Sequence, residues 1–283
     1  MNHPWVISVP ALSYSTEALL WGDYILAKYG KGITVAGLVN NNEFGAAYRV
    51  AFEKWAKDNG VTFKYELHDP QAASVTNEMT TLAATNADVV VLMTAGNFCT
   101  MGIKAVAESS WRPKERLVSN TCNGLTFFKP AGAAAEGWVS VSDRKDVSDP
   151  ADQKDPKIAE FRDILSKAGL DPNNTTIGGG IGQYGWSMVD LLQRASKLPG
   201  GLSRTNAMLA ARSVNTVHPY FRDGIKYRMN GNKDAYPIEG AITVRWTIPP
   251  GQENGSNVPF GTLKDLDGQT PNCAWDGKTC KDG

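Results

Sequence analysis

Short apolar segments alternate with amphipathic segments through the first half of the chain, and this alternation restricts the fold more than any other feature. Segments of strand length with apolar or alternating character lie at residues 5–9, 33–39, 61–67, 88–93, 116–119 and 137–141. Each of the first four is followed by a stretch whose apolar residues recur at helical spacing. This alternation predicts an α/β fold with a doubly wound, mostly parallel sheet.

The pattern changes after residues 142–150, a polar and charged segment that ends in proline and suits a connection between two lobes. Beyond this segment, amphipathic helices are predicted at 158–168, 184–197 and 203–214, whereas only 224–229 and 243–247 look extended. The residues from Pro249 onward are rich in Gly, Pro, Asn and Asp and are predicted to be loop. The predicted division is therefore residues 1–145 as a ligand-binding α/β lobe, 146–232 as the helical part of another lobe, and 233–283 as a C-terminal strand and loop segment.

Charge and hydropathy exclude two classes of partner. The chain has 29 Lys and Arg residues and 29 Asp and Glu residues, so its formal net charge is zero. Because a protein that binds nucleic acid normally needs a basic surface, no nucleic acid partner is expected. The longest apolar run, at residues 87–95, is much shorter than the roughly 20 residues of a membrane helix, so the chain is not expected to span a membrane.

No sequence pattern predicts a metal, a cofactor or a catalytic residue. The three histidines, His3, His68 and His218, are widely separated and are expected to be surface or packing residues. Residues 180–185 spell G-x-G-x-x-G, but no buried strand precedes them and no acidic residue follows about 20 positions later, so a dinucleotide site is not predicted. The G-x-S-x-G turn of a hydrolase is absent as well.

Polar loops follow three of the predicted strands, at residues 40–45, 94–98 and 120–123. In a doubly wound sheet, ligands bind outside the carboxyl ends of the strands, so these loops are expected to share one rim. Asn, Gly and Thr are also ordinary turn residues, and plain turn chemistry is the alternative. Phe44 and Phe98 favour a binding rim, because aromatic side chains in polar loops suit a cleft for a small organic ligand.

The order of these features resembles the type I periplasmic solute-binding proteins of the branched-chain amino acid, amide and aromatic-acid uptake class. The resemblance covers about residues 3–200 and rests on HPWV at 3–6, LVNNNEFG at 38–45, ADVVV at 87–91, AEG at 135–137 and YGW at 184–186. It implies two α/β lobes that close on a ligand, with the second lobe largely complete here. The strands and helices that precede this region in family members are absent, so a truncated first lobe is expected.

The resemblance also implies the role and the place of the protein. It would be the periplasmic or extracellular component of an ABC transporter, would capture a small-molecule ligand and deliver it to a membrane permease, and would not be an enzyme. Together with the strand-end argument, the resemblance predicts a rim formed by Tyr14, Asn42, Phe44, Thr94, Asn97, Phe98 and Thr121.

Two positions put a standard amino acid in doubt as the ligand. Family members that bind amino acids hold the ammonium group with acidic side chains after the first strand and after the strand at 116–119. Here Ser13 and Tyr14 follow the first strand, and Asn120, Thr121 and Cys122 follow the other. Because an unpaired buried ammonium is costly, a neutral or carboxylate ligand without an amine is expected.

The cysteines are expected to form disulfides, as in an exported protein. Cys273 and Cys280 are separated by a short span that contains Asp-Gly and can turn back, and a bond between them is predicted. Cys99 and Cys122 follow neighbouring strands and are a second candidate pair, the alternative being two separate buried thiols.

Three other functions stay open. A ligand-sensing receptor or regulator domain has the same fold, and permease or kinase genes nearby would separate transport from sensing. An α/β enzyme would show turnover or cofactor binding. A chain with an incomplete lobe would have no binding function of its own.

Overall fold

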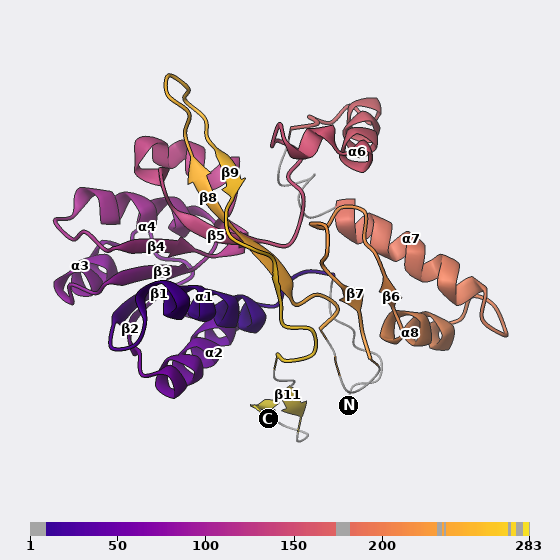
Figure 1. Cartoon of the computed structure of the whole chain (residues 1–283), viewed down its shortest axis with the longest axis horizontal. Helices are drawn as coiled ribbons and strands as arrows, with labels where there is room; N and C mark the ends of the chain where they lie inside the picture. Colours follow the sequence, from indigo (N-terminus) through magenta and orange to yellow (C-terminus); the bar gives the residue numbers. More distant parts are fainter. Residues whose placement is uncertain are drawn as a thin grey trace. The chain divides into compact units, whose positions relative to one another are not determined.

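The computed structural model describes residues 10–173, 182–230, 234, 236–270, 273–275 and 280–282, and the strand expected at 5–9 lies outside this part (Figure 1). The chain forms two compact units. One, here called the sheet unit, consists of residues 14–142 and 242–262. The other, here called the helical unit, consists of residues 1–13, 143–241 and 263–283.

The sheet unit alternates helices and strands as the sequence predicts. In chain order its elements are α1 (Tyr14–Tyr29), β1 (Thr34–Asn40), α2 (Glu43–Asn59), β2 (Thr62–His68), α3 (Thr76–Ala84), β3 (Val89–Met93), α4 (Asn97–Glu108), β4 (Glu115–Val118), η1 (Asn120–Cys122), α5 (Leu125–Phe128), η2 (Lys129–Ala135), β5 (Val139–Ser142), most of β8 (Gly240–Thr247) and β9 (Ser256–Pro259).

The strands β2, β1, β3, β4 and β5 lie side by side in that order and are all parallel. β8 adds antiparallel to β5, and β9 pairs antiparallel with β8. The chain moves outward from β1 to β2 and then returns to the other side of β1 with β3. The direction in which the strands are added therefore reverses between β1 and β3, which is the switch point of a doubly wound sheet. The predicted fold class is confirmed.

Helices cover both faces of the sheet. On one face, Leu38 and Leu92 pack with residues of α3 and α4, including Met79 and Ile103. Because side chains alternate along a strand, Val39 points to the opposite face, where α2 packs against β1 and α1 packs against α2. All five side chains are buried, as expected for a parallel sheet between two helical layers.

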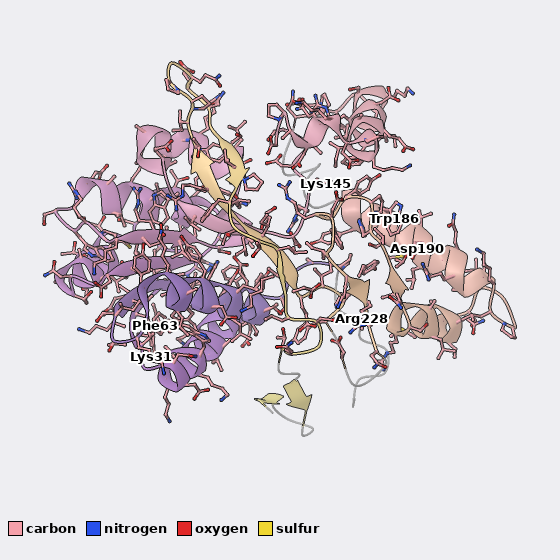
Figure 2. All side chains as sticks on the ribbon, in the orientation of Figure 1. Lys31, Phe63, Lys145, Trp186, Asp190 and Arg228 are labelled. Atoms are coloured by element: carbon pink, nitrogen blue, oxygen red, sulfur yellow. A yellow bond between two sulfur atoms is a disulfide. The ribbon has the colours of Figure 1, made fainter. Side chains whose placement is uncertain are left out.

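The helical unit contains α6 (Pro156–Lys167), α7 (Gly182–Ser196) and α8 (Arg204–Arg212), together with the short elements η3 (Asp152–Lys154), β6 (Asn215–Thr216), β7 (Tyr227–Arg228), β10 (Lys264–Asp265), β11 (Cys273–Trp275) and β12 (Cys280–Asp282). Its described cores are small. One forms around Phe221, with Trp186 of α7 packed against it (Figure 2), and another forms around Ile158.

Several large apolar side chains of the helical unit are exposed. On α7, Met188 is 56%, Val189 55% and Leu192 44% exposed, and Leu209 of α8 is 55% exposed. The apolar stripes predicted for these helices therefore exist, and part of them is not covered within the described residues.

The loop prediction for the residues beyond Pro249 is wrong at 256–259. These residues form β9, in which Ser256 pairs with Thr247 and Pro259 with Val244. The sequence Ser-Asn-Val-Pro has no alternating apolar pattern, because an edge strand is held by backbone pairing to one neighbour only. The predicted C-terminal segment 233–283 is consequently divided, with 242–262 in the sheet unit and the rest in the helical unit.

Candidate functional site

The loops that follow β1, β3 and β4 meet at the carboxyl edge of the sheet, and we call this edge the rim. The first turns of α2 and α4 begin at the rim, on the two sides of the switch point between β1 and β3. This is the place where doubly wound folds bind ligands, because helix N-termini present free N–H groups there.

Gly45 allows α2 to start directly against the end of β1. A Cβ atom at this position would lie 1.9 Å from the carbonyl oxygen of Asn40, so any larger residue would displace the helix. Asn42 caps the helix, since its Oδ1 accepts a hydrogen bond of 3.1 Å from the Gly45 N–H. Asn42 is thus at the rim, as predicted, but its side-chain oxygen is used by the backbone.

Four aromatic rings form a wall at one end of the rim. The rings of Tyr14 and Phe44 meet edge to face with centroids 4.5 Å apart. Both rest on Tyr48, which stacks on Trp21 at 5.0 Å. Tyr14 is 36% exposed and Phe44 is half-buried, whereas Tyr48 and Trp21 are fully buried. The outer two rings therefore offer an apolar surface whose position is fixed from beneath.

Phe98 lies at the other side of the switch point and packs on His68, with ring centroids 4.2 Å apart. His68 Nδ1 is 3.1 Å from the Asp69 carbonyl oxygen, which only accepts, so Nδ1 carries the proton in the neutral ring. Nε2 then accepts from the Thr94 hydroxyl at 2.7 Å. Burial lowers the pKa of His68, and the hydrogen bond to Asp69 opposes part of this shift. The ring is therefore held neutral beneath Phe98.

Thr94 and Thr121 are brought together, although they are 27 positions apart in the chain. Thr121 Oγ1 donates to the Thr94 carbonyl oxygen at 3.2 Å and lies 2.8 Å from Ser119 Oγ. Thr94 is fully buried and its hydroxyl is occupied by His68, whereas Thr121 is exposed. Of the two predicted threonines, only Thr121 presents its side chain at the surface of the rim.

The buried carboxyl group of Glu17, in α1, contacts the loop that follows β4. Its Oε1 accepts a hydrogen bond of 2.6 Å from the Asn120 N–H, and its Oε2 lies 2.6 Å from Tyr48 Oη. Tyr48 Oη is also 2.8 Å from Ser119 Oγ. Burial, followed by the neighbouring Glu17, raises the pKa of Tyr48 well above its ordinary value. The Glu17 side chain thereby connects α1 with Tyr48 of α2 and with Asn120 in the loop after β4.

A disulfide joins Cys99, in the first turn of α4, to Cys122, in the loop after β4, with the two Cα atoms 5.6 Å apart. It connects two of the three rim loops. The side chains of the other predicted pair, Cys273 and Cys280, lie outside the described residues; their backbones belong to β11 and β12, which pair antiparallel.

All seven predicted rim residues lie on the sheet unit, at the carboxyl ends of its strands or at the start of α1, α2 and α4. Sequence reasoning missed Glu17, Tyr48 and Ser119, and it treated His68 as a surface or packing residue. Glu17 and Tyr48 lie within helices, where a polar residue carries no signal of its partner. An acidic residue on the buried face of an otherwise apolar helix is the one signal that could have pointed to Glu17.

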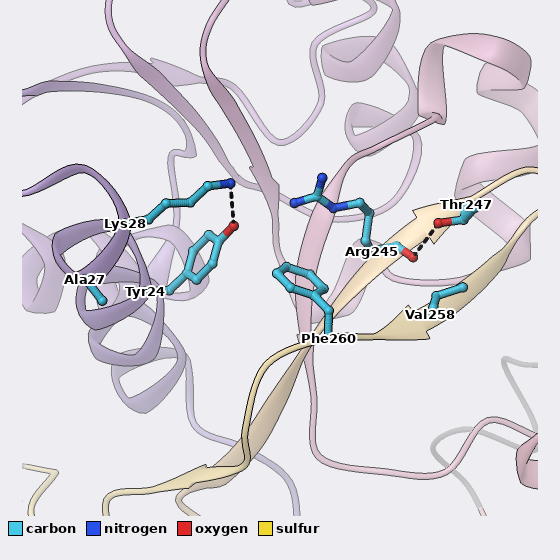
Figure 3. Close-up of a pocket in the computed structure, with 7 residues that line it drawn as sticks. All are labelled: Tyr24, Ala27, Lys28, Arg245, Thr247, Val258 and Phe260. Atoms are coloured by element: carbon cyan, nitrogen blue, oxygen red, sulfur yellow. Dashed lines mark hydrogen bonds between the residues drawn. The ribbon is translucent and has the colours of Figure 1, made fainter.

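A surface cavity of about 620 Å³ lies at the opposite, amino edge of the sheet (Figure 3). It is lined by Tyr24, Ala27, Lys28, Arg245, Thr247, Val258 and Phe260. Lys28 Nζ is 2.5 Å and Tyr24 Oη 2.6 Å from the buried carboxylate of Glu115, and Arg245 lies over the ring of Phe260 at 4.8 Å. Burial and the hydrogen bond to Glu115 raise the pKa of Tyr24 to about 12. These charged groups satisfy one another, which marks a structural clamp between α1 and the sheet.

Within the described part of the chain, no three His, Cys, Asp or Glu side chains gather as a metal site. No helix among those residues combines the length and the apolar character needed to cross a bilayer.

Comparison with known proteins agrees with the geometry. The model of the periplasmic binding protein family matches residues 2–247. No curated protein sequence matched the chain. Among solved structures, a branched-chain amino acid ABC transporter protein from Thermus thermophilus with bound valine is similar with a TM-score of 0.71 and 19% identity, over 89% of this chain and 66% of that one.

Two further structures are similar at 15% identity and a TM-score of 0.70. A protein described as an ABC transporter permease from the Pseudomonas fluorescens group matches 89% of this chain and 63% of its own, and a fatty acid ABC transporter substrate-binding protein from Thermomonospora curvata matches 95% and 69%. The chain thus spans less than two thirds of the first two relatives. On the family match, the switch-point sheet and the shared fold, the chain belongs to the periplasmic binding protein family and has its type I fold.

Proposed function

We propose that the chain captures a small organic ligand at the rim, as the solute-binding component of an ABC uptake system. The observation that carries this proposal is the aromatic wall of Tyr14 and Phe44 beside the switch point, supported from beneath by Tyr48. An apolar surface of fixed position next to a few polar groups is the usual composition of a small-molecule site.

The ligand is proposed to be a carboxylate or an amide that lacks an amine. Both oxygens of the Glu17 carboxyl group are engaged, by the Asn120 N–H and by Tyr48 Oη, so this group is not offered to a ligand ammonium. The loop after β4 presents Thr121 instead. The first turns of α2 and α4 point their N–H groups at the same rim, which favours an anionic or carbonyl oxygen.

A matched pair of ligands tests this proposal. Leucine and 4-methylpentanoate have the same carbon skeleton, and only leucine carries the amine. Amide chemical shifts in two-dimensional NMR detect binding down to millimolar affinity, so they also register a ligand that the rim binds weakly. We expect 4-methylpentanoate or its amide to shift the amides of residues 43–46 and 119–122, and leucine to shift them less. Tighter binding of leucine would overturn the proposed ligand class, and no shift with any carboxylate or amide would overturn capture at the rim.

The transport role and a periplasmic or extracellular location are proposals that rest on family membership and on the similarity to ABC transporter substrate-binding proteins. A receptor domain that senses the same ligand is the second candidate. Genes for a permease and an ATPase beside the gene for this chain support uptake, and a kinase or regulator gene in their place supports sensing.

A further inference from the structure

A second cavity, of about 420 Å³, lies at the amino edge of the sheet, beside the start of β4. Arg112, Lys114, Arg116 and Arg245 line it, and Glu115 is the one acidic residue among the described residues of its lining. All five belong to the sheet unit. We call this cavity the arginine pocket, and it lies at the edge of the sheet opposite to the rim.

Two guanidinium groups of the arginine pocket have no ion-pair partner among the described residues. Lys114 pairs with Asp88 at 2.8 Å, whereas Arg112 and Arg116 form no such pair in that part of the chain. Burial lowers the pKa of Arg116, and the like charge of Arg245 adds to this shift while neighbouring carboxylates oppose it. Positive charges therefore face one another in the arginine pocket, and an anion placed between them would be stabilised.

Most hydrogen-bond donors of these two arginines are unused. Arg112 Nη1 donates to the carbonyl oxygens of Ser109 and Trp111, at 2.5 and 2.9 Å. Arg116 Nη2 donates to the carbonyl oxygen of Glu136 at 2.9 Å. The other nitrogens of both side chains have no hydrogen-bond partner within the described residues. Because a guanidinium group has five N–H donors, several of them are offered to a ligand.

Two of the guanidinium groups are held by neighbouring rings. Arg116 lies over the ring of Trp138 at 5.8 Å, and Arg245 lies over the ring of Phe260 at 4.8 Å (Figure 3). Gly137 leaves room for Arg116, because a Cβ atom at this position would lie 2.8 Å from Arg116 Nη2. Its φ of +79° also favours glycine. Side chains that are already ordered lose less entropy when they bind a ligand.

We propose that the arginine pocket binds a phosphate group, held by Arg112, Arg116 and Arg245. Guanidinium groups donate paired hydrogen bonds to phosphate oxygens. A tetrahedral phosphate accepts such bonds from several directions, whereas a planar carboxylate is matched by one guanidinium group. A free phosphate-bearing solute and a lipid headgroup present the same oxygens. The proposal does not rest on ligand capture at the rim.

Inorganic phosphate is the probe, added to the full chain at low and constant ionic strength, with chloride as the matched anion. Two-dimensional NMR reads the backbone amides of residues 112–116 and Gly137 and the side-chain Nε–H groups of the arginines. We expect phosphate to shift these resonances until they saturate, acetate to shift them less, and chloride to leave them unchanged. An equal response to acetate would overturn the proposed ligand class.

Vesicles distinguish the two sources of the phosphate group. If the group belongs to a free solute, inorganic phosphate alone produces the shifts and the protein does not sediment with vesicles. If it belongs to a headgroup, the protein sediments with vesicles of phosphatidylcholine and phosphatidic acid, and not with phosphatidylcholine alone. No response to either inorganic phosphate or phosphatidic acid would overturn the proposal.

Arg112→Gln and Arg116→Gln should each weaken phosphate binding about tenfold, because each removes hydrogen bonds between charged groups. Lys104→Gln is the matched control, since Lys104 is an exposed cation on α4 outside the pocket lining. Arg112 is exposed, so its variant tests the proposal even where Arg116→Gln does not fold.

Equal weakening in all three variants would overturn the assignment, because it would show an effect of net charge alone. Phosphate shifts confined to residues 43–46 and 119–122 would overturn it as well, because they would place the anion at the rim. The test of the proposed function uses other ligands and reads those rim residues. A failure of one proposal is therefore distinguishable from a failure of the other.

Discussion

At the scale of single residues, Phe44 and Phe98 are expected to carry much of the apolar contact with the ligand, because each is a partly exposed ring on a buried support. Replacing either ring by alanine should weaken binding by roughly 1–2 kcal/mol, about five- to thirtyfold in Kd. Titration with the carboxylate that binds best measures the effect. Phe63→Ala is the matched control, since Phe63 is a half-buried ring near the amino end of β2 (Figure 2).

Equal affinity in Phe44→Ala, Phe98→Ala and Phe63→Ala would show that the rim is not the binding surface. A loss of affinity in all three would indicate a general loss of structure, which the unfolding midpoint of each variant would reveal.

His68 should make the stability of the sheet unit depend on pH. Because burial lowers its pKa below the ordinary value of 6.5, the folded state favours the neutral ring and the unfolded chain binds more protons near that pH. The contribution of His68 is therefore complete above about pH 6.5 and is lost as the pH falls through the lower pKa of the folded state.

Denaturant unfolding of the unmodified protein and of His68→Gln between pH 5 and 8 measures this contribution. The variant should lose less stability on the acidic side, since glutamine does not titrate and His3 and His218 are present in both proteins. Parallel stability curves for the two proteins would contradict the assignment.

Sequence reasoning at this scale identified residues beside the strand ends and missed the buried residues that contact them from beneath. The places of Phe44 and Phe98 beside the strand ends were predictable, because an aromatic residue in a polar strand-end segment is conspicuous, and their binding role stays a prediction. Glu17 contacts residues 31 and 103 positions away in the chain, and His68 contacts Thr94. Such partners depend on the order of the strands, which a single sequence does not state.

At the scale of elements, the entry of α2 depends on Gly45. Gly45→Ala places a methyl group where the Asn40 carbonyl oxygen stands, so we expect a loss of at least about 2 kcal/mol in the free energy of unfolding. Gly185→Ala in α7 is the matched control, because nothing lies within 4 Å of its Cβ position and alanine favours a helix by about 1 kcal/mol. A Gly45→Ala protein as stable as the unmodified one would show that α2 does not start as described.

The disulfide between Cys99 and Cys122 closes a loop with a sequence separation of 23 residues. A loop of this length is expected to stabilise the folded state by about 3 kcal/mol, mainly by restricting the unfolded chain. Urea unfolding with and without a reductant, compared with a Cys99→Ala, Cys122→Ala double variant, measures it. Identical midpoints in all three conditions would mean that the bond adds nothing to stability.

Most elements were predictable because the periodicity of their apolar residues is visible within the segment itself. β9 was not predictable, because its own residues carry no such periodicity. Val89–Met93 is a run of five apolar residues and forms β3 as predicted. Ser256–Pro259 becomes a strand only because the backbone of β8 lies beside it.

At the scale of the whole molecule, the exposed apolar surface on α7 should cause self-association. Met188, Val189 and Leu192 lie within four positions on that helix and are about half exposed. Sedimentation velocity over a range of concentrations should show reversible association, and Met188→Lys with Leu192→Glu should reduce it. Gln193→Glu, on an exposed polar position of the same helix, is the control, and a monodisperse unmodified protein would contradict the expectation.

The sequence predicts a connection between lobes at residues 142–150, and the first segment of the sheet unit ends at Ser142. How the C-terminal part is shared between the two units was not predicted. Residues 242–262 return to the sheet unit because β8 pairs with β5, a contact between residues about 100 positions apart. The short strand at 137–141 was predicted from the sequence, but the identity of its antiparallel neighbour was not.

The disulfide between Cys99 and Cys122 also means that the rim depends on the redox conditions in which the chain is found. In a reducing compartment the chain carries two thiols instead, and the loops after β3 and β4 are then joined by non-covalent contacts such as the hydrogen bond from Thr121 Oγ1 to the Thr94 carbonyl oxygen. Oxidation joins them only after the chain reaches an environment that allows disulfides. For a chain that is exported as proposed, the covalent connection between these two rim loops is therefore made after export, as the last step in building the rim.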